Sequence, residues 1–573
     1  MGEIRRRALQ TLDWGADVHP VLRRVYAARG IARAEELDLS LERLLPVSSL
    51  PGVEAAAGLL ATHRERGRVL VVGDFDADGA TGTALLVRAL RALHFMHVDF
   101  LVPNRFRFGY GLTPGIVAQA AAREPSLIVT VDNGVSSIEG VEAAHALGIP
   151  VLITDHHLPG ALLPRAKVIV NPNLADSPFA SAALAGVGVA FYVVAALARA
   201  LGRSDFRPAD LLDLVALGTV ADMVPLDRNN RVLVAQGLRR IRAGRCVPGV
   251  RALLESAGRR LEQVSAADLG FAVAPRLNAA GRLTDMSIGI SCLLADDPEQ
   301  AALLASQLAK LNEERREIEQ RMQLEAVELA AAVRFDSAGS ESLGLCLFDE
   351  SWHQGVVGLV AGRIKDRLNR PVIAFARTEE GSLRGSARSV SGINIRDVLD
   401  GIAARRPGLI EKFGGHAMAA GMTLREASFE EFRAAFAREI AARTDVDALS
   451  GILYTDGELS GAELSLETAR VLRSAGPWGQ GFPEPVFDGA FRIADARIVG
   501  GKHLKLQLRG SGEAGAPALD AIAFGYVGGA LEHPSIRSGA DVRLAYRLEL
   551  NEYNGAERVQ LNCQHLQPGS LSE

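Results

Sequence analysis

The chain has 573 residues, of which 48% are hydrophobic and 23% are charged, and its formal net charge is -5 at pH 7. This composition excludes a peptide scaffold and a largely disordered protein, and the length predicts roughly three or four domains. The negative charge excludes a basic coat that binds duplex DNA without specificity, but local basic patches could still bind nucleic acid.

Residues 1–65 form the first predicted element, a helical segment in which apolar positions alternate with Arg and Glu. Its first fifteen residues contain no apolar run of the kind that a secretory signal requires. The four cysteines of the chain include no CxxC pair, which disfavours a zinc ribbon or a disulfide framework. Both observations predict a cytoplasmic protein.

Residues 66–295 are predicted to form a domain around a parallel α/β sheet. Short β-branched runs alternate with helical stretches, as in RVLVVGDFDADG, SLIVTVDNG, PVLITDHH and KVIVNPN. Ligands of such sheets bind at the carboxyl ends of the strands, so the polar residues that follow these runs are functional candidates. The uncharged segment 179–198 is long enough to span a bilayer, but its Ala and Gly content predicts a buried core helix instead.

The rest of the chain predicts a connecting helix and two further domains. Residues 296–335 form a long helix with Pro298 in its first turn, which at 1.5 Å per residue would run ~55 Å and suits a link between two lobes. Residues 336–445 are a second α/β lobe with strands such as LGLCLF. Residues 446–573 alternate like a β-barrel, with a hairpin turn at Asn554-Gly555. The predicted fold is α/β, with two lobes joined by a helix and a terminal barrel.

Acidic and histidine residues follow the apolar runs of the first lobe. They are Asp74, Asp76, Asp78, Asp132, Asp155, His156, His157 and Asp222. Carboxylates this close repel each other unless a cation offsets them, although a solvated turn would also explain the GDFDADG group taken alone. Carboxylates with an imidazole suit Mn²⁺ or Mg²⁺ better than Zn²⁺. Two such ions would bind a phosphate and activate a water, which predicts phosphoester hydrolysis.

These motifs resemble the DHH phosphoesterase family, named for the Asp-His-His run found here at residues 155–157. Within it, nearly the whole chain resembles the single-strand-specific 5′ to 3′ DNA exonucleases, through GDFDADG, VDNG, TDHH, VADMVPL, PRLNAAGRL, SWHQGVVG, GSARS and KFGGH. The implied metal ligands are Asp76, Asp78, Asp132, His156 and Asp222, with Asp74 as a further candidate. Asp132 would bridge the two ions, and Asp155 and the catalytic candidate His157 would orient ligands or contact substrate. Many members have a histidine where this chain has Val72, which leaves the ligands of the first ion open.

The resemblance extends to substrate binding, since the second lobe is similar to a DHHA1 domain and the barrel to an OB fold. The implied contacts are Arg276, Asn278, His353, Arg384, Ser386, Arg388, Ser389, Gly414, Gly415 and His416. Arginine forks and glycine amides suit phosphates, although a surface ion pair is the alternative for any one arginine. Arg105 and Tyr110 combine a cation with a ring, which is typical of single-strand binding.

By resemblance, we expect an exonuclease that uses two Mn²⁺ or Mg²⁺ ions to release 5′-mononucleotides from single-stranded DNA, in repair and recombination. The DHHA1 lobe would hold the 5′ phosphate while the next phosphodiester is cut. The implied partners are a single-stranded-DNA-binding protein and a RecQ-type helicase, with no membrane and a monomeric state. Two alternatives are a phosphodiesterase for oligoribonucleotides or cyclic dinucleotides, which would not need the barrel, and an inactive DNA-binding scaffold, which would not need intact ligands.

Overall fold

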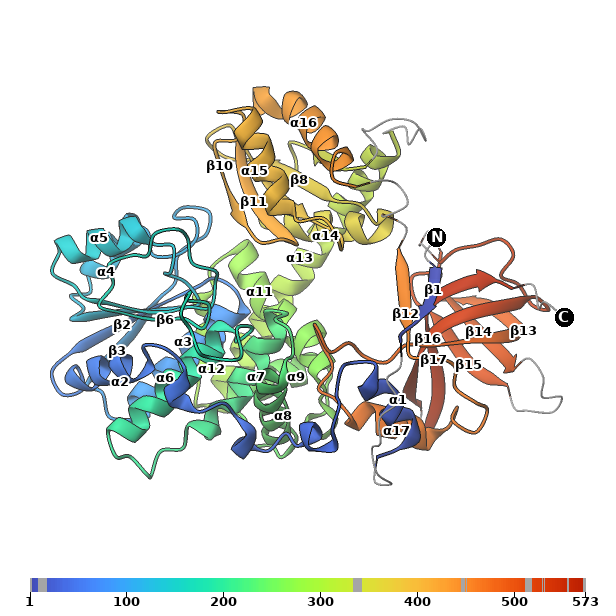
Figure 1. Ribbon diagram of the computed structural model, residues 1–573, viewed down its shortest axis with the longest axis horizontal. Coiled ribbons are helices and arrows are strands. Elements are labelled where there is room, and N and C mark those ends of the chain that lie inside the picture. Colours follow the sequence, from blue (N-terminus) through green and yellow to red (C-terminus); the bar gives the residue numbers. More distant parts are fainter. Residues whose placement is uncertain are drawn as a thin grey trace. The chain divides into compact units, whose positions relative to one another are not determined.

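The computed structural model describes residues 3–8, 18–332, 343–444, 449, 451–510, 518–527, 529, 531–553 and 556–569. Figure 1 labels the helices and strands along the chain, which divides into two compact units. Unit A comprises Gln10–Glu313 and Val471–Glu484, and unit B comprises Met1–Leu9, Glu314–Arg470 and Pro485–Glu573. The predicted long helix is α13 (Pro298–Ala332), and the boundary between the units falls within it.

Unit A is built on a five-stranded parallel sheet in the order β3-β2-β4-β5-β6. The strands are β2 (Arg68–Gly73), β3 (His97–Leu101), β4 (Leu127–Val131), β5 (Val151–Thr154) and β6 (Val168–Val170). Four of them were predicted from their apolar runs. The fifth, β3, was missed because it is a half-exposed edge strand with no continuous apolar run.

Two hydrophobic cores cover the two faces of this sheet, because successive side chains of a strand point in opposite directions. Val69 and Val71 pack into the core that contains α2, α3 and α6, whereas Leu70 and Val72 pack into the core that contains α4 and α5. These helices are α2 (Val53–Thr62), α3 (Ala77–Ala92), α4 (Pro114–Ala121), α5 (Ile138–Ala146) and α6 (Gly186–Ala200). The predicted core helix is confirmed in α6, whose side chains are almost all buried.

A helical layer completes unit A. It consists of α1 (Pro20–Ala27), α7 (Leu212–Ala221), α8 (Arg228–Arg242), α9 (Pro248–Ser256), α10 (Ala266–Asp268), the π-helical turn η6 (Leu269–Val273), α11 (Ala274–Leu283) and α12 (Ser287–Leu294). Among the described residues, no single helix is long and apolar enough to cross a membrane. The segments Leu41–Ser49 and Val53–Thr62 meet that test only as a pair bent by 76°.

Unit B contains the second α/β lobe, whose mixed sheet has the order β10-β11-β9-β8-β7. Its strands are β7 (Leu345–Phe348), β8 (Val372–Arg377), β9 (Ser382–Arg388), β10 (Lys412–Gly415) and β11 (Ala419–Arg425). Its helices are α14 (Val357–Leu368), α15 (Ile395–Arg405) and α16 (Phe429–Ala441). Only β7 and β8 pair in parallel, and the other pairs are antiparallel.

The predicted terminal barrel is confirmed as a closed five-stranded barrel. Its strands are β13 (Phe487–Val499), β14 (His503–Gly510), β15 (Leu519–Ala523), β16 (Asp541–Tyr553) and β17 (Ala556–Pro568), and α17 (Leu466–Ser474) precedes them. Strands β16 and β17 pair in antiparallel register. The turn predicted at Asn554-Gly555 lies outside the described residues.

The helical prediction for residues 1–65 is wrong at its beginning, where Glu3–Arg6 forms strand β1. This strand pairs in parallel with β12 (Ile452–Thr455), a partner almost 450 residues away. Its Arg6 guanidinium donates to both carboxylate oxygens of Asp488, which is 1% exposed and also accepts hydrogen bonds from Thr455 and Arg543. Local sequence carries no sign of this pairing, because the partner strand and the buried carboxylate are both distant in the chain.

Candidate functional site

The candidate site of unit A forms where three neighbouring strands end. Because β2, β4 and β5 are adjacent in the sheet, the residues that follow them, Asp74, Asp132 and Asp155, lie at one edge. All three side chains are buried. Asp222 reaches the same place from the end of α7, where it follows the last helical residue. The predicted strand-end carboxylates are therefore brought together by the topology of the sheet.

Asp76 and Asp78 hold the turn after β2 in a fixed conformation. Asp76 caps helix α3, since its Oδ1 accepts hydrogen bonds from the N–H groups of Asp78 and Gly79 at 3.0 Å. The two oxygens of Asp78 accept from Gly186 at 2.7 Å and Val187 at 2.9 Å, at the start of α6. A Cβ on Gly186 would lie 2.7 Å from the Asp132 side chain, so this position requires glycine. The sequence analysis missed Gly186, whose signal is the small-residue stretch AGVGVA.

His156 faces three of the carboxylates. Its Nε2 lies 3.0 Å from Asp132 Oδ1, 3.5 Å from Asp222 Oδ2 and 4.0 Å from Asp78 Oδ2. Asp132 itself has a φ of +63°, a conformation that costs a residue other than glycine about 1 kcal/mol or more and that occurs often in functional sites. The strained backbone directs this carboxylate toward the imidazole.

Asp155 and His157 form an ion pair beside the cluster. Asp155 Oδ1 accepts hydrogen bonds from His157 Nδ1 at 2.8 Å and from the N–H of His156, and Oδ2 accepts from the N–H of Val135. Burial raises the pKa of Asp155, but hydrogen bonding and the charge of His157 outweigh it and lower that pKa overall. Burial lowers the pKa of His157, but Asp155 outweighs it and raises that pKa to about 9. His157 therefore carries a positive charge near neutral pH, while Tyr110 donates from its hydroxyl to the carbonyl of Asp132.

The remaining carboxylates repel one another in a buried setting. Burial, and then the charge of Asp76, raises the pKa of Asp222 to about 7. Burial likewise raises the pKa of Asp74, Asp78 and Asp132 well above the usual range, with neighbouring carboxylates adding to each shift. Such a cluster is unstable when ionised unless a cation offsets it.

The donor atoms fit a divalent metal centre. Three groups, each with its ligand atoms within 4.8 Å of one another, are Asp74-Asp76-Asp132, Asp78-His156-Asp222 and Asp132-His156-His157. Asp74 Oδ1 and Asp132 Oδ1 are buried and accept no hydrogen bond from the described residues, which leaves them available to a cation. Oxygen donors with one or two imidazoles suit Mn²⁺ or Mg²⁺. Val72 lies in the core on the far side of β2, whereas Asp74 joins the cluster.

Loop and helix residues support this centre from two sides. Asn278 on α11 accepts a hydrogen bond from the N–H of Ala77 at 2.8 Å and so fixes the start of α3. Arg276 on the same helix donates to the carbonyl of Ala272. The Arg105 guanidinium lies 4.6 Å from the centre of the Phe75 ring. In the sequence, Phe75 stands between Asp74 and Asp76. Arg105, Tyr110 and Asn278 thus contact the motif loops.

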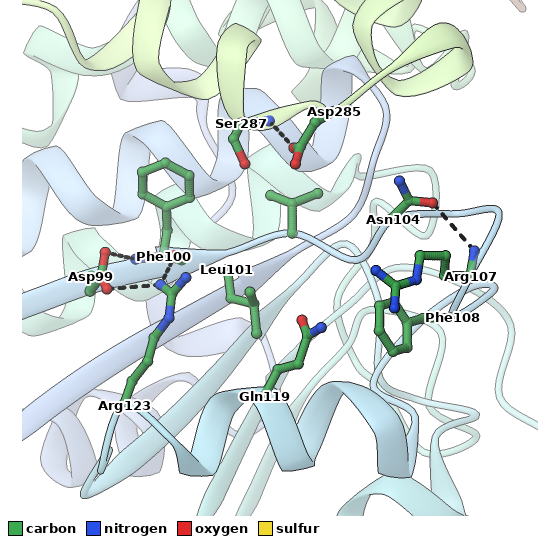
Figure 2. A pocket seen from close by; sticks show the side chains of 11 residues that line it. Asp99, Phe100, Leu101, Asn104, Arg107, Phe108, Gln119, Arg123, Asp285 and Ser287 are labelled. Atoms are coloured by element: carbon green, nitrogen blue, oxygen red, sulfur yellow. Dashed lines mark hydrogen bonds and ion pairs between the residues drawn. The ribbon is translucent and has the colours of Figure 1, made fainter.

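A cavity of about 490 Å³ lies beside edge strand β3 and is distinct from this centre (Figure 2). Figure 2 shows the Arg107 guanidinium and the Gln119 amide among its lining side chains. Arg123 donates to Asp99 Oδ2 and to the carbonyl of Phe100, which covers the unpaired edge of the strand. None of the predicted site residues is among those that line this cavity.

Unit B places four of the remaining predicted residues, Arg384, Ser386, Arg388 and Gly414, on the strands of its sheet. Arg384, Ser386 and Arg388 alternate along β9 and are half-buried. The register aligns Ser386 with Gly421 and Gly421 with Gly414 across three strands. A Cβ on either glycine would meet nothing within 4 Å, so Gly414 and Gly421 form an open glycine surface beside the arginines. Gly421 was missed by sequence reasoning, and a glycine inside a strand is the signal that marks it.

Other unit B candidates have structural contacts. Ser389 is buried and donates to the carbonyl of Ile393, which makes it a turn residue. His353 Nδ1 accepts from the N–H of Gly355 before α14. Gly415 has a φ of +139° at the end of β10, and the exposed His416 follows it. The predicted site residues are thus distributed over both units, with the acidic and histidine cluster in unit A and the β9 arginines in unit B.

Three parts of the chain match known protein families, and the whole chain matches known proteins. Residues 68–219 match the DHH family, N-terminal domain; residues 341–442 match the DHHA1 domain; and residues 455–565 match the RecJ OB domain. The chain is 51% identical over 576 residues to a protein of Dickeya dadantii named single-stranded-DNA-specific exonuclease RecJ, and 51% identical over 577 residues to that of Escherichia coli, covering 99% of both chains in each case. A crystal structure of RecJ in complex with Mn²⁺ from Thermus thermophilus is similar at a TM-score of 0.80 and 32% identity, covering 97% of this chain and 77% of that one.

Proposed function

The chain belongs to the RecJ family of DHH phosphoesterases, and on that premise we propose that it degrades single-stranded DNA from the 5′ end and releases 5′-mononucleotides. The observation that carries this proposal is the buried cluster of carboxylates and histidines at the strand ends, with oxygens left free for a cation. Its donor set suits the Mn²⁺ that the Thermus relative binds.

We assign the metal ligands to Asp74, Asp76, Asp78, Asp132, His156 and Asp222. Asp132 belongs to two of the three ligand groups, which is what a bridging carboxylate requires. When bound, Mn²⁺ or Mg²⁺ supplies Lewis acidity at the phosphate and an acidic water that serves as the nucleophile. The backbone hydrogen bonds to Asp76 and Asp78 hold these carboxylates in place before any ion arrives.

His157 is the residue we assign to the substrate phosphate. Its pairing with Asp155 keeps it protonated, and a fixed, partly exposed cation next to the cluster stabilises the charge that develops on a phosphodiester. Arg105 and Tyr110, which contact the same loops, are proposed to hold a neighbouring phosphate and base.

In unit B, we propose that the glycine surface formed by Gly414 and Gly421, together with the arginines of β9, holds the 5′-terminal phosphate. Arg388 donates to Ser386 Oγ, and a Cβ on Gly358, in the first turn of α14, would lie 2.8 Å from both side chains. A helix N-terminus beside arginine forks suits a phosphate monoester. His353, Arg384, Gly415 and His416 are further proposed contacts in this unit, whereas Arg276 belongs to unit A and is a proposed contact of the strand there.

The division of labour we propose follows the predicted domains. Residues 66–295 carry the chemistry, residues 336–445 hold the 5′ end, and residues 446–573 bind the strand. A cytoplasmic monomer that receives single strands from a RecQ-type helicase and from a single-stranded-DNA-binding protein, in DNA repair and recombination, is the setting that suits this substrate.

End-labelled DNA tests the proposal directly. Purified protein with Mn²⁺ should release mononucleotide from a 5′-labelled single strand first, leave a blunt duplex intact, and lose activity with EDTA. Asp132→Asn should lose at least about a thousand-fold in rate, whereas Asp176→Asn, an exposed residue of the same unit, should be unaffected. Cleavage of only short oligoribonucleotides or cyclic dinucleotides would support the small-substrate alternative, and binding without cleavage would support the scaffold.

A further inference from the structure

Several large apolar side chains of unit A are exposed, and two of them, Phe271 and Met223, lie on neighbouring elements close to the metal centre in the fold. The Phe271 side chain is 79% exposed and that of Met223 is 69% exposed. Phe271 makes no contact with another aromatic ring among the described residues. Exposed aromatic residues in a protein otherwise able to bury its apolar side chains often mark a binding surface.

Both residues lie on elements that meet at the end of α7, the helix that Asp222 follows. Met223 follows Asp222 directly and has a φ of +60°, so a strained backbone turns the chain outward at this point. Helix α7, which ends at Ala221, packs against the π-helical turn η6 that contains Phe271. The approach is close, since a Cβ on Gly270 would lie 3.2 Å from the Val220 side chain.

The π-helical turn explains how Phe271 becomes exposed. In η6 the N–H of Ala274 bonds to the carbonyl of Leu269, five residues back, which adds one residue to the helical turn. An added residue rotates the helix preceding it relative to α11, so that Leu269 and Val273 are buried while Phe271 projects outward. Turns of this kind are retained mainly at functional sites.

We propose that Phe271 is a stacking surface for one nucleobase of the single-stranded substrate, on the element that packs against α7 next to the metal centre. The proposal rests on the proposed function. Helix α11 follows the π-helical turn directly and carries Arg276 and Asn278, of which Asn278 accepts from the N–H of Ala77 in the acidic motif loop, so the segment that exposes Phe271 continues into residues that contact the metal centre. Stacking reads no sequence, because every base has an aromatic face.

The surface should fix the position of the strand relative to the bond that is cut. A base held beside Asp222 limits how far the strand can slide between successive cuts, so loss of the ring should weaken binding and misplace the phosphodiester. A nucleotide without a base cannot stack, which makes an abasic site the matched perturbation on the DNA side.

The test combines a variant with abasic substrates. Full-length wild type, Phe271→Ala and Phe271→Trp are compared on single-stranded oligonucleotides that carry one abasic site at successive positions from the 5′ end. We measure KM and kcat with Mn²⁺, and dissociation constants by fluorescence anisotropy without divalent metal. Met96→Ala is the control, because Met96 is 65% exposed but precedes β3 at the opposite, amino-terminal edge of the sheet.

The expected result is non-additivity at one position. Phe271→Ala should weaken binding of intact DNA about 10-fold, within the range of base stacking on an aromatic ring, and one abasic position should weaken wild type equally. At that position Phe271→Ala should show no further loss, while Phe271→Trp and Met96→Ala behave like wild type. Equal losses at every position, or no loss on intact DNA, would overturn the stacking surface. Failure of wild type to bind or cut single strands would instead overturn the proposed function.

Discussion

Replacing Asp222 with asparagine should stabilise the metal-free protein while abolishing its activity. The carboxyl lies among other carboxylates with 23% of its side chain exposed, and its pKa is raised from the ordinary value of 3.8 to about 7. Between pH 3.8 and about pH 7, the Asp222 carboxyl is ionised in the unfolded chain but protonated in the folded protein. Each step of one pH unit then lowers the free energy of unfolding by about 1.4 kcal/mol. At pH 8 the accumulated loss is up to about 4 kcal/mol, and asparagine, which cannot ionise, removes it.

The measurement is the free energy of unfolding of EDTA-treated protein between pH 4 and pH 8. We expect the curves of wild type and Asp222→Asn to diverge as pH rises toward 7 and to run parallel above it. Asp176→Asn is the control and should follow wild type, because Asp176 is exposed. Saturating Mn²⁺ should reverse the order, since the ion stabilises wild type and the variant lacks one ligand. Curves that remain parallel from pH 4 to pH 8 would refute the electrostatic argument.

Three further results are expected. Mn²⁺ binding at pH 6.5 should release protons, because carboxyls whose pKa is raised, such as that of Asp132, must ionise to bind the ion. Binding enthalpies that are identical in buffers of different ionisation enthalpy would contradict this. Gly186→Ala should lower the rate roughly 100-fold, because the added Cβ displaces the Asp132 side chain. Gly58→Ala is the control: its Cβ would meet open space on α2, so the variant should keep its activity and gain about 1 kcal/mol of stability. Equal activities of the two variants would argue against the close packing of Gly186 on Asp132. Asp488→Asn should destabilise unit B by about 3 kcal/mol at pH 7. Burial raises the pKa of Asp488, but the hydrogen bonds from Arg6, Thr455 and Arg543 together outweigh it and lower that pKa overall. This difference should therefore persist above pH 4 and vanish as pH falls below it, as measured by calorimetry.

Much of the site could be predicted from sequence because its residues follow strands of a parallel sheet. Apolar runs identify β2, β4 and β5, and strand order in such sheets brings their carboxyl ends to one edge. Asp74, Asp132 and His156 therefore came together as predicted. Edge strand β3 was missed, since an edge strand needs no continuous apolar run.

The sequence by itself determined the fold class, the barrel, the long helix and the acidic cluster, because each depends on local periodicity or on motifs of fixed spacing. Only the tertiary structure decided which carboxylates are buried against one another, and hence which pKa values rise. It also decided the alignment of Gly421 with Ser386 and the exposure of Phe271. The pairing of β1 with β12 belongs with these, because it joins residues that no local pattern relates. Burial and register arise from contacts between distant segments, whereas periodicity and motif spacing are properties of the chain itself.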